Sequence, residues 1–515
     1  MRVGLLTSAF LGLMAGSLLV ASDKAWAQST TATEPPIIGA LRIEGIENIQ
    51  LDGLIAKMET FVGLEADGET LKQLAGIVTN EAKDRGYIFA SVSVPPQSVR
   101  IGIVTVNFDP GIIDDVRING SANGHLKTIL APLKGAPGEK SSVERQLLLV
   151  EDLPGISVKN TRYVKEDGRG ILIVDVAEDR IEGNLAIDNW GSENYGPIRL
   201  RGNAQINRLL SRADSVSVSA TTTPAQPKEL SYLSGAYITP IGSGGATVSV
   251  SGGVGKTQPG GQPNGLKVVG DSRSAALTVR TPLKRTVDSS LWISGEMAYL
   301  DVDQKLLDNW IQQDTTTSLT LNFSGSHALA GGRLSWGLGY VRGLDMFGAS
   351  HAGDPLLSRR DGSGLFSKQQ LWFNWFGDIG GGMSVRIAGT AQHASRGLLS
   401  AHELTYGGAF FGKGYDFAEI SGDDGLLGLI ELRRDLKLPW SSVKWAHLYG
   451  FVDGAWLDNK DDLITAGSLF SAGLGARAGV GSVEIGIEGA MPLKQAPYGN
   501  DDLKPRFNFI LGYGL

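Results

Sequence analysis

The feature that most constrains the fold of this chain is an alternation of apolar with polar or small residues, at a period of two, over residues 181–515. One segment places four apolar side chains on one face: Leu334, Trp336, Leu338 and Tyr340. The last segment repeats the pattern with five: Phe507, Phe509, Leu511, Tyr513 and Leu515. Because successive side chains of a strand point to opposite faces, the pattern predicts many strands with one apolar face each.

These strands favour a closed barrel in a membrane. A membrane-spanning strand takes roughly 10 residues. Residues 181–515 therefore accommodate about 16 antiparallel strands with their turns and loops. The 70 glycines suit strands that face lipid on one side and water on the other. A soluble β-sandwich or propeller is the alternative, and the aromatic last strand argues against it.

The first 27 residues have the pattern of a secretory signal peptide. Arg2 supplies the positive charge, residues 3–20 are mostly apolar, and Ala25 and Ala27 form an A-x-A cleavage site. We expect cleavage after Ala27, leaving a short extension over residues 28–36. An uncleaved anchor helix is the alternative, but the cleavage site directly follows the apolar run.

Residues 37–180 are predicted to form two small α/β domains. The first domain, residues 37–110, is predicted to have strands at 37–44, 90–94 and 101–108, and helices at 51–61 and 70–85. The second domain, residues 111–180, is predicted to have strands at 114–119, 157–165 and 170–178, and helices at 125–130 and 142–149. Both have the order β-α-α-β-β, which indicates one plan used twice.

Composition and motifs argue against several function classes. The chain has no cysteine, which excludes disulfides and Cys-based metal sites. Its six histidines lack the spacing of a zinc motif, and its Gly-rich stretches do not open a helix after a strand. No G-x-S-x-G segment lies in a strand–turn–helix context. We therefore predict no catalytic residue, no metal and no cofactor. The net charge of −7 does not suggest a nucleic-acid partner.

A glycine-rich segment from Phe410 to Gly425 interrupts the late strands. It carries the tip Gly412, Lys413, Gly414 and Tyr415. Glycines let such a tip turn tightly. In a following strand, Asp453 lies on the face opposite the apolar residues. An ionised carboxylate facing lipid costs several kcal/mol, so we expect Asp453 to face the barrel lumen. From sequence spacing alone, a solvated loop lysine is the simpler interpretation of Lys413. For Asp453 the alternative is a lumen-facing carboxylate with no special partner.

Several motifs in order resemble one family. Gly86-Tyr87 precedes a stretch with Pro96, Gln97 and Gly102. The segment LLVEDLPG ends in Leu153, Pro154 and Gly155, and DNWG occupies residues 188–191. Together these resemble the outer-membrane transporters of two-partner secretion, the haemolysin secretion/activation proteins of the Omp85 superfamily. The resemblance covers essentially the whole chain after the signal peptide.

The resemblance implies a role for the glycine-rich segment. In the family, the corresponding loop folds into the barrel, with a V-R-G-Y or V-R-G-F tip held by the aspartate of an F-x-D-x-G motif. Here the infolded loop would be residues 406–425, with Lys413 in place of arginine. Phe451 and Asp453 match the wall motif, although its final glycine is shifted. The resemblance thus implies that Lys413 pairs with Asp453. A lysine lacks the bidentate fork of arginine, which predicts a weaker clamp. Glu431 is expected to be a general pore-lining charge.

The resemblance also implies a function. The two α/β domains would be periplasmic POTRA domains that capture an unfolded partner exoprotein, adhesin-like or cytolysin-like, through an exposed sheet edge. The barrel, a monomer inserted into outer-membrane lipid by the barrel-assembly machinery, would then secrete that partner without ATP. Residues 28–36 are too short for the helix that plugs relatives, so the loop would be the main obstruction.

Three alternatives remain open. A barrel-assembly or insertion factor of the same superfamily usually carries three to five POTRA domains, whereas this chain shows two repeats. A passive porin would not need residues 37–180. A barrel enzyme is the third, and no catalytic motif favours it.

Overall fold

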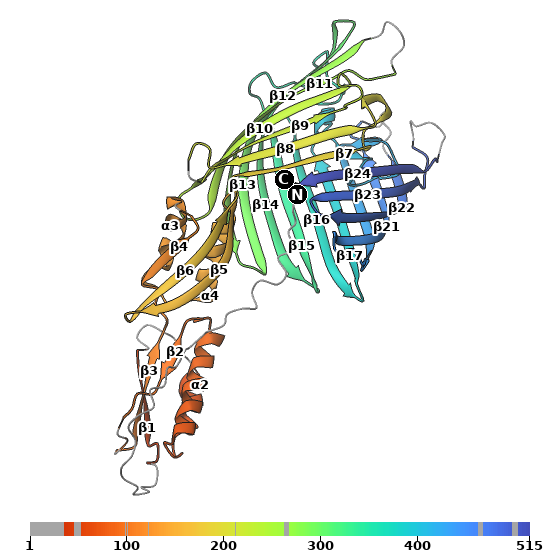
Figure 1. Cartoon of the computed structure of the whole chain (residues 1–515). Helices are drawn as coiled ribbons and strands as arrows, with labels where there is room; N and C mark the ends of the chain where they lie inside the picture. Colours follow the sequence, from red (N-terminus) through yellow and green to blue (C-terminus); the bar gives the residue numbers. More distant parts are fainter. Residues whose placement is uncertain are drawn as a thin grey trace. The chain divides into compact units, whose positions relative to one another are not determined.

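A computed structural model describes residues 36–45, 53–97, 99, 101–121, 123–211, 213–261, 267–461, 467–496 and 503–514. The expected signal peptide and residues 28–35 lie outside this part. The chain forms two compact units, one of α/β structure and one dominated by a barrel. Figure 1 colours the α/β elements red to orange and the barrel yellow to blue. Within the described residues, no helix has the length and apolar character needed to cross a membrane.

The first α/β domain has the predicted element order. Its elements are β1 (Ala40–Glu44), α1 (Leu54–Glu59), α2 (Gly68–Asp84), β2 (Ser91–Ser93) and β3 (Ile103–Asp109). The sheet order is β1-β3-β2, with β1 parallel and β2 antiparallel to β3. Helix α2 packs Leu74 and Val78 into the same core as Val104 and Val106 of β3. The central strand is therefore covered by the helices.

The second α/β domain repeats this plan. Its elements are β4 (Asp115–Asn119), α3 (Gly124–Leu130), a 3₁₀ turn η1 (Ala131–Leu133), α4 (Lys140–Glu151), β5 (Ile156–Glu166) and β6 (Arg169–Glu178). The sheet order is β4-β6-β5, with β4 parallel to β6. The last strand is thus central in both domains, and β5 lies at an edge.

The motif residues of these domains have local structural roles. Gln97 follows β2, and its side-chain amide both donates to and accepts from the backbone of Thr105 at 2.8 Å. It thereby extends the pairing along β3 after β2 has ended. Pro96 lies beside it in this turn. Gly102 has a positive φ of 72° and lies against the backbone of residues 37–39, which favours glycine.

The LPG motif forms the turn between α4 and β5. Leu153 is buried there, and its carbonyl accepts a hydrogen bond from the amide of Ile156 across Pro154. Gly155 has a φ of 66°, and a Cβ at this position would lie 2.2 Å from the carbonyl oxygen of Asp179. The motif therefore sets how the chain leaves α4.

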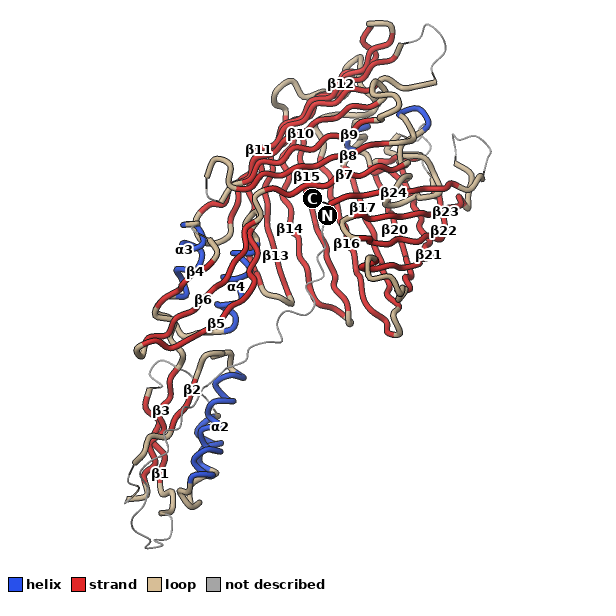
Figure 2. Tube along the Cα trace, viewed as in Figure 1, coloured by secondary structure: helices blue, strands red, loops and turns tan. Residues whose placement is uncertain are grey.

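The second unit contains a closed barrel of sixteen strands within the described residues, as predicted. Figure 2 shows the strands as a continuous wall. The strands are β7 (Ile181–Asp188), β8 (Arg199–Asn207), β9 (Ser215–Thr222), β10 (Leu230–Ile241), β11 (Ala246–Thr257), β12 (Val268–Arg285), β13 (Ser289–Leu306), β14 (Asn309–Leu329), β15 (Gly332–Leu344), β16 (Ser367–Gly380), β17 (Met383–Ala394), β20 (Asp424–Asp435), β21 (Val443–Asp458), β22 (Ser468–Val480), β23 (Val483–Pro492) and β24 (Arg506–Gly514). All neighbouring strands pair antiparallel.

Short elements lie in the loops between barrel strands. They are the 3₁₀ turns η2 (Glu193–Tyr195) and η3 (Ser400–His402) and the strands β18 (Leu404–Tyr406) and β19 (Ile420–Gly422).

The two faces of the barrel wall differ in chemistry. In β20, the outward residues Leu426, Ile430 and Leu432 are all exposed. The inward residues Leu429 and Glu431 of the same strand are buried. An apolar outer face and a lumen that holds charge are the arrangement of a membrane barrel.

The seam between the first and last barrel strands is short. Strands β7 and β24 share five register pairs, whereas β8 and β9 share eight. Beyond the last pair, the Asn189 side chain donates to the Phe507 carbonyl and accepts from the Phe509 amide, both at 2.7 Å. One side chain thus replaces two backbone hydrogen bonds and lengthens the seam.

We predict that Asn189→Ala weakens the barrel at this seam. Each lost hydrogen bond is worth about 1 kcal/mol, so the temperature at which the folded barrel shifts to its unfolded mobility in a gel should fall by several degrees. The control is Asn203→Ala, which removes one side-chain contact to Ser219 inside the eight-pair β8–β9 ladder. Equal losses in both variants would contradict a special role for Asn189.

Candidate functional site

The loop between β17 and β20 folds back on itself. Its strands β18 and β19 pair from Leu404↔Gly422 to Tyr406↔Ile420. Between them, Gly407, Gly408 and Gly412 all have positive φ. A Cβ on Gly412 would lie 2.6 Å from the amide nitrogen of Gly407, so the tip requires glycine there. The sequence therefore folds this segment into a compact hairpin.

This hairpin packs against the inward face of the barrel wall. Tyr406, Tyr415 and Ile420 form a buried cluster with wall residues of β20, β21 and β22. The wall residues are Leu427, Ala455, Leu457 and Leu469. Since Leu427 shares its face with Glu431, the loop lies on the lumen side. Apolar contact of this kind holds the hairpin while its tip reaches further strands.

Asp453 on β21 binds the base of the tip. Its Oδ1 accepts hydrogen bonds from the Tyr406 hydroxyl at 2.5 Å, the Gly412 amide at 2.9 Å and the Ser471 hydroxyl at 2.8 Å. Its side chain is 2% exposed. The expectation that Asp453 faces the lumen and meets the loop agrees with these contacts.

The expected pairing of Lys413 with Asp453 is wrong. Lys413 Nζ donates to Oε2 of Glu488 on β23 at 2.9 Å. The reason is geometric: Asp453 already binds the backbone of Gly412, and the next side chain extends from there toward β23. The family motif correctly identified Asp453 as a wall residue that binds the loop. It did not identify Glu488 as the carboxylate that pairs with Lys413.

Glu431 also differs from its expectation as a general pore-lining charge. Its Oε2 lies 3.6 Å from Lys413 Nζ, and its Oε1 accepts from Arg433 at 2.5 Å. The lysine therefore lies between carboxylates from two strands. Its ammonium is also 4.1 Å from the ring centroid of Phe451 and 5.3 Å from that of Tyr449, within the range of cation–π attraction.

The other tip residues contact the wall as well. The Gly414 amide donates to the Ser471 hydroxyl at 3.3 Å, and a Cβ on Gly414 would lie 2.8 Å from the backbone nitrogen of Pro492. The Tyr415 hydroxyl is within hydrogen-bond distance of the carbonyl oxygens of Phe470 (2.9 Å) and Lys494 (2.5 Å). The whole predicted tip, Gly412 to Tyr415, is thus brought onto the wall.

Glu488 is the main site residue that sequence reasoning missed. It is 5% exposed, and the Tyr449 hydroxyl also donates to it at 2.8 Å. The signal was present in the alternation of β23, where Glu484 and Glu488 share the face opposite Ile485 and Ile487. An ionised carboxylate facing lipid is costly, so Glu488, like Asp453, is expected to face the lumen.

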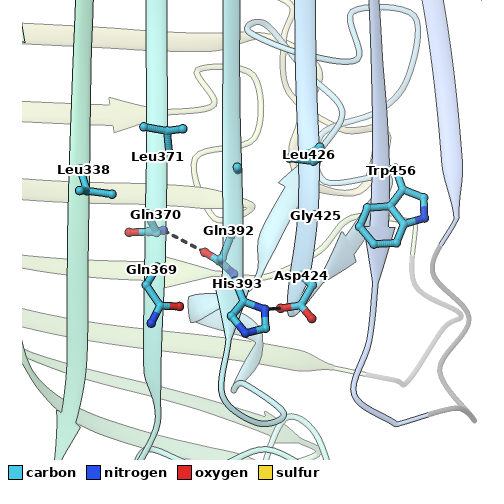
Figure 3. A pocket seen from close by; sticks show the side chains of 11 residues that line it. Leu338, Gln369, Gln370, Leu371, Gln392, His393, Asp424, Gly425, Leu426 and Trp456 are labelled. Atoms are coloured by element: carbon cyan, nitrogen blue, oxygen red, sulfur yellow. Dashed lines mark hydrogen bonds and ion pairs between the residues drawn. The ribbon is translucent and has the colours of Figure 1, made fainter.

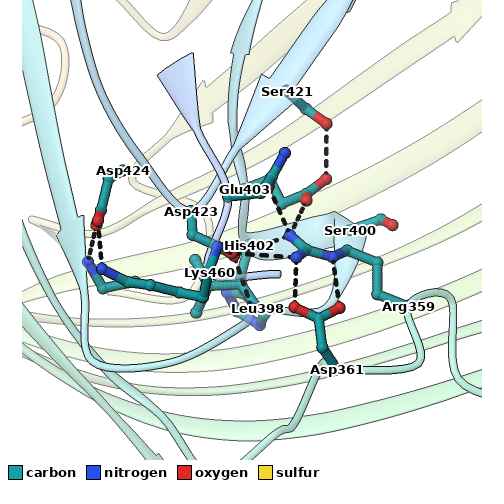
Figure 4. A network of polar contacts seen from close by, with 12 residues as sticks. Arg359, Asp361, Leu398, Ser400, His402, Glu403, Ser421, Asp423, Asp424 and Lys460 are labelled. Carbon is teal, nitrogen blue, oxygen red and sulfur yellow. Dashed lines mark hydrogen bonds and ion pairs between the residues drawn. The ribbon is translucent and has the colours of Figure 1, made fainter. Parts of the chain in front are cut away.

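A second polar network lies in the loops outside the strands (Figure 4). Arg359, in the loop after β15, is 7% exposed. Its guanidinium donates to Asp361 at 2.6 Å, to Asp423 at 2.9 Å and to Asn459 at 3.0 Å, and also contacts Glu403. These partners come from the loops that follow β15, β17 and β21. One arginine therefore cross-links three loops, including both ends of the infolded hairpin.

The carboxylates of this network stabilise the charged form of Arg359. Burial acts to lower the pKa of Arg359, but Asp361, Glu403 and Asp423 outweigh it, and the pKa is raised. Burial raises the pKa of Glu403, although Ser421 and Arg359 oppose the rise. Asp423 also accepts from the Leu398 amide at 2.7 Å. The arginine is thus held as a cation among carboxylates. Nothing in the sequence pattern indicated this network, because its members lie in separate loops.

One hollow lies along strands β15, β16, β17, β20 and β21. It has a volume of about 370 Å³, and Figure 3 shows Leu338, Leu371, Leu426 and Trp456 around it. Leu426 belongs to the outward face of β20, so the hollow lies mainly on the apolar outside of the barrel. His393 and Asp424, 3.1 Å apart, mark its polar end.

A smaller hollow of about 320 Å³ is lined by residues that include Glu296, Thr316, Ser318, Lys368 and His402. In the described part of the chain, no group of three or more histidine or acidic side chains could hold a metal ion.

Comparison with known proteins identifies relatives. Residues 168–478 match the family described as haemolysin secretion/activation protein ShlB/FhaC/HecB, and residues 37–111 match the POTRA domain of ShlB type.

Curated relatives are distant in sequence. The hemolysin transporter protein HpmB of Proteus mirabilis is 22% identical over 72% of this chain and 66% of its own length. The outer membrane transporter CdiB of Dickeya dadantii is 21% identical over 79% of this chain and 74% of its own. The heme/hemopexin transporter protein HuxB of Haemophilus influenzae is 23% identical, but the match spans only about a third of each chain.

Solved structures match the fold over nearly the whole chain. CdiB from Escherichia coli has a TM-score of 0.76 at 18% identity and covers 95% of this chain and 93% of its own. BamA from Haemophilus ducreyi lacking POTRA domains 1–3 has a TM-score of 0.56 at 14% identity and covers 94% and 99%. At these identities the likeness establishes the fold.

We predict that Arg359→Gln loosens the three loops it joins. Removing one partner from a buried ion pair typically costs about 3–5 kcal/mol, because charges are left uncompensated. Proteases added outside intact cells should then cleave in the loops after β15, β17 and β21 at least several-fold faster. The neighbouring Arg360 is exposed, so Arg360→Gln is the matched control. Unchanged cleavage in Arg359→Gln would contradict the prediction that Arg359 restrains these three loops.

Proposed function

Because this chain belongs to the haemolysin secretion/activation protein family, we propose that it captures an unfolded partner exoprotein and secretes it across the outer membrane. The family is one of two-partner secretion, and its barrels lie in the outer membrane with POTRA domains in the periplasm. The exported partner is proposed to be adhesin-like or cytolysin-like, in keeping with a relative named a hemolysin transporter.

The observation that carries this proposal is the hairpin on the inner wall. Its contacts with Asp453 and Glu488, at 2.9 Å each, and with Ser471, at 3.3 Å, are all buried. A channel for a polypeptide needs an obstruction at rest that yields when the substrate arrives. We propose that this loop is that obstruction.

The periplasmic domains provide a surface for capture. Strand β5 is 11 residues long and lies at the edge of the β4-β6-β5 sheet. An edge strand presents unpaired backbone groups that can add a strand from another chain. Such pairing tolerates many sequences, which suits an extended, unfolded partner. Neither ATP nor a cofactor enters this scheme, and folding of the partner outside the cell would drive its passage.

The alternatives receive less support. An assembly or insertion factor of the same superfamily is represented by BamA, whose TM-score of 0.56 is below the 0.76 of the CdiB match. A porin does not account for the two α/β domains. We further propose that the transporter acts as a monomer, surrounded by outer-membrane lipid and inserted by the barrel-assembly machinery.

We predict that deleting residues 37–180 abolishes export but leaves a pore. The barrel closes through its own strand ladder, so it should still insert and conduct ions in planar bilayers. The amount of partner in the medium should fall to background, measured against wild-type cells. Continued export by the deletion variant would show that these domains are not the receptor.

We also predict that fixing the loop tip to the wall stops export. The chain lacks cysteine, so Lys413→Cys and Glu488→Cys can be joined selectively by a short, reducible thiol crosslinker. Export should stop after crosslinking and recover on reduction. Each single-cysteine variant treated with the same reagent is the control. Undiminished export by the crosslinked double variant would contradict a loop that must move.

A further inference from the structure

We propose that Lys413 is a placeholder: the wall site it occupies accepts basic side chains of the exported polypeptide during passage. The site consists of Glu488, Glu431 and the ring faces of Phe451 and Tyr449. This inference rests on the proposed function and specifies the chemistry that the lumen recognises.

The site has more acceptor capacity than Lys413 uses. Glu488 is 95% buried, and only its Oε2 receives donors, from Lys413 and Tyr449. Within the described residues, Oε1 of Glu488 has no hydrogen-bond partner, and neither has Oδ2 of Asp453, whose other oxygen binds the Gly412 amide. Buried acceptors without donors are unfavourable. The wall can therefore take up a cation with more donors than the single ammonium now present, such as a guanidinium.

A row of rings leads to the site. Trp445, His447, Tyr449 and Phe451 alternate along one face of β21, with successive ring centroids 5.4, 5.9 and 6.4 Å apart. Strands alternate in direction from β7, which enters the barrel from the periplasmic domains, so β21 also begins at the periplasmic end. Trp445 at that end is 42% exposed, whereas Phe451 is 4% exposed beneath Lys413. The row thus runs from an open end toward the occupied site.

Aromatic faces suit a basic chain in transit. They attract ammonium and guanidinium groups without requiring one orientation, and Arg477 already lies 5.5 Å from the ring centroid of Tyr449. An incoming basic side chain can therefore move along the row while keeping a favourable contact.

Exchange at the site conserves charge. Lys413 makes one hydrogen bond of 2.9 Å and a longer ion pair of 3.6 Å. Withdrawing it alone would leave the buried Glu488 without its cation, which is strongly unfavourable. A basic side chain from the substrate restores that charge as the loop tip departs. Displacement of the loop is thereby coupled to the presence of substrate.

The test uses purified full-length protein in planar bilayers and two synthetic unfolded peptides. They have the same length and sequence, except that one carries repeated lysines where the other carries glutamines. Each is added on the side of the periplasmic domains, and its affinity is measured from the block of ionic current. In Lys413→Ala the resident competitor is gone, so the lysine peptide should bind about tenfold more tightly than to wild type. The glutamine peptide should be unchanged.

Two further variants identify the site. Lys413→Ala combined with Glu488→Gln should lose the gain for the lysine peptide. Lys413→Ala combined with Glu484→Gln should keep it. Glu484 lies on the same face of β23, but among the described residues the β23 carboxylate that binds Lys413 is Glu488. The gel shift on heating confirms that each variant contains a folded barrel.

The outcomes separate this inference from the proposed function. Three results would overturn the placeholder role. They are no gain in affinity for the lysine peptide in Lys413→Ala, an equal gain for both peptides, and a gain that persists in the variant that also lacks Glu488. Export of the partner is measured independently in cells. Export without charge discrimination would refute this inference alone, and discrimination without export would refute the secretion role.

Discussion

The structure depends on one constraint: in lipid, every backbone N–H and C=O group must find its partner within the protein. A sheet meets this demand only by closing on itself, and the sixteen strands do so through the short seam between β7 and β24. Closure separates the side chains into an apolar outer set and an inner set that carries charge. The polar chemistry of the transporter is therefore confined to the lumen and to the loops outside the membrane.

A closed lumen creates a second demand, because carboxylates buried on its wall need donors. Asp453 and Glu488 meet it by binding the infolded hairpin, one through the Gly412 amide and the other through Lys413. The hairpin is thus held by two separable sets of contacts, and a weaker hold by lysine than by arginine stays a prediction. Outside the strands, Arg359 adds a third restraint through Glu403 and Asp423 at the two ends of the hairpin. A loop held at its tip and its base is suited to stay in the lumen until another molecule competes for the wall carboxylates that bind it.

Much of the architecture could be predicted from residue order. The period of two predicted the strands, because side-chain alternation is a local property of extended backbone. The length of the segment predicted their number. Helical spacing predicted the α/β repeats for the same reason, although the structure begins β1 at Ala40 rather than residue 37. The face occupied by Asp453 also followed from parity. The partner of Lys413 did not, because a lysine side chain reaches several wall positions and the family motif pointed to only one of them. The expected signal peptide lies outside the described residues.

The amino-acid sequence by itself determined which side chains face lipid, which segments alternate between strand and helix, and which loop could fold tightly. These properties depend on neighbours one to four positions apart. Only the tertiary structure decided that Lys413 meets Glu488 and Glu431 and that Arg359 joins three loops. Those contacts connect residues tens of positions apart, and they exist because barrel closure fixes which strands and loops stand next to one another. The physical reason is that register and closure, rather than local preference, set the distances between charges in the lumen.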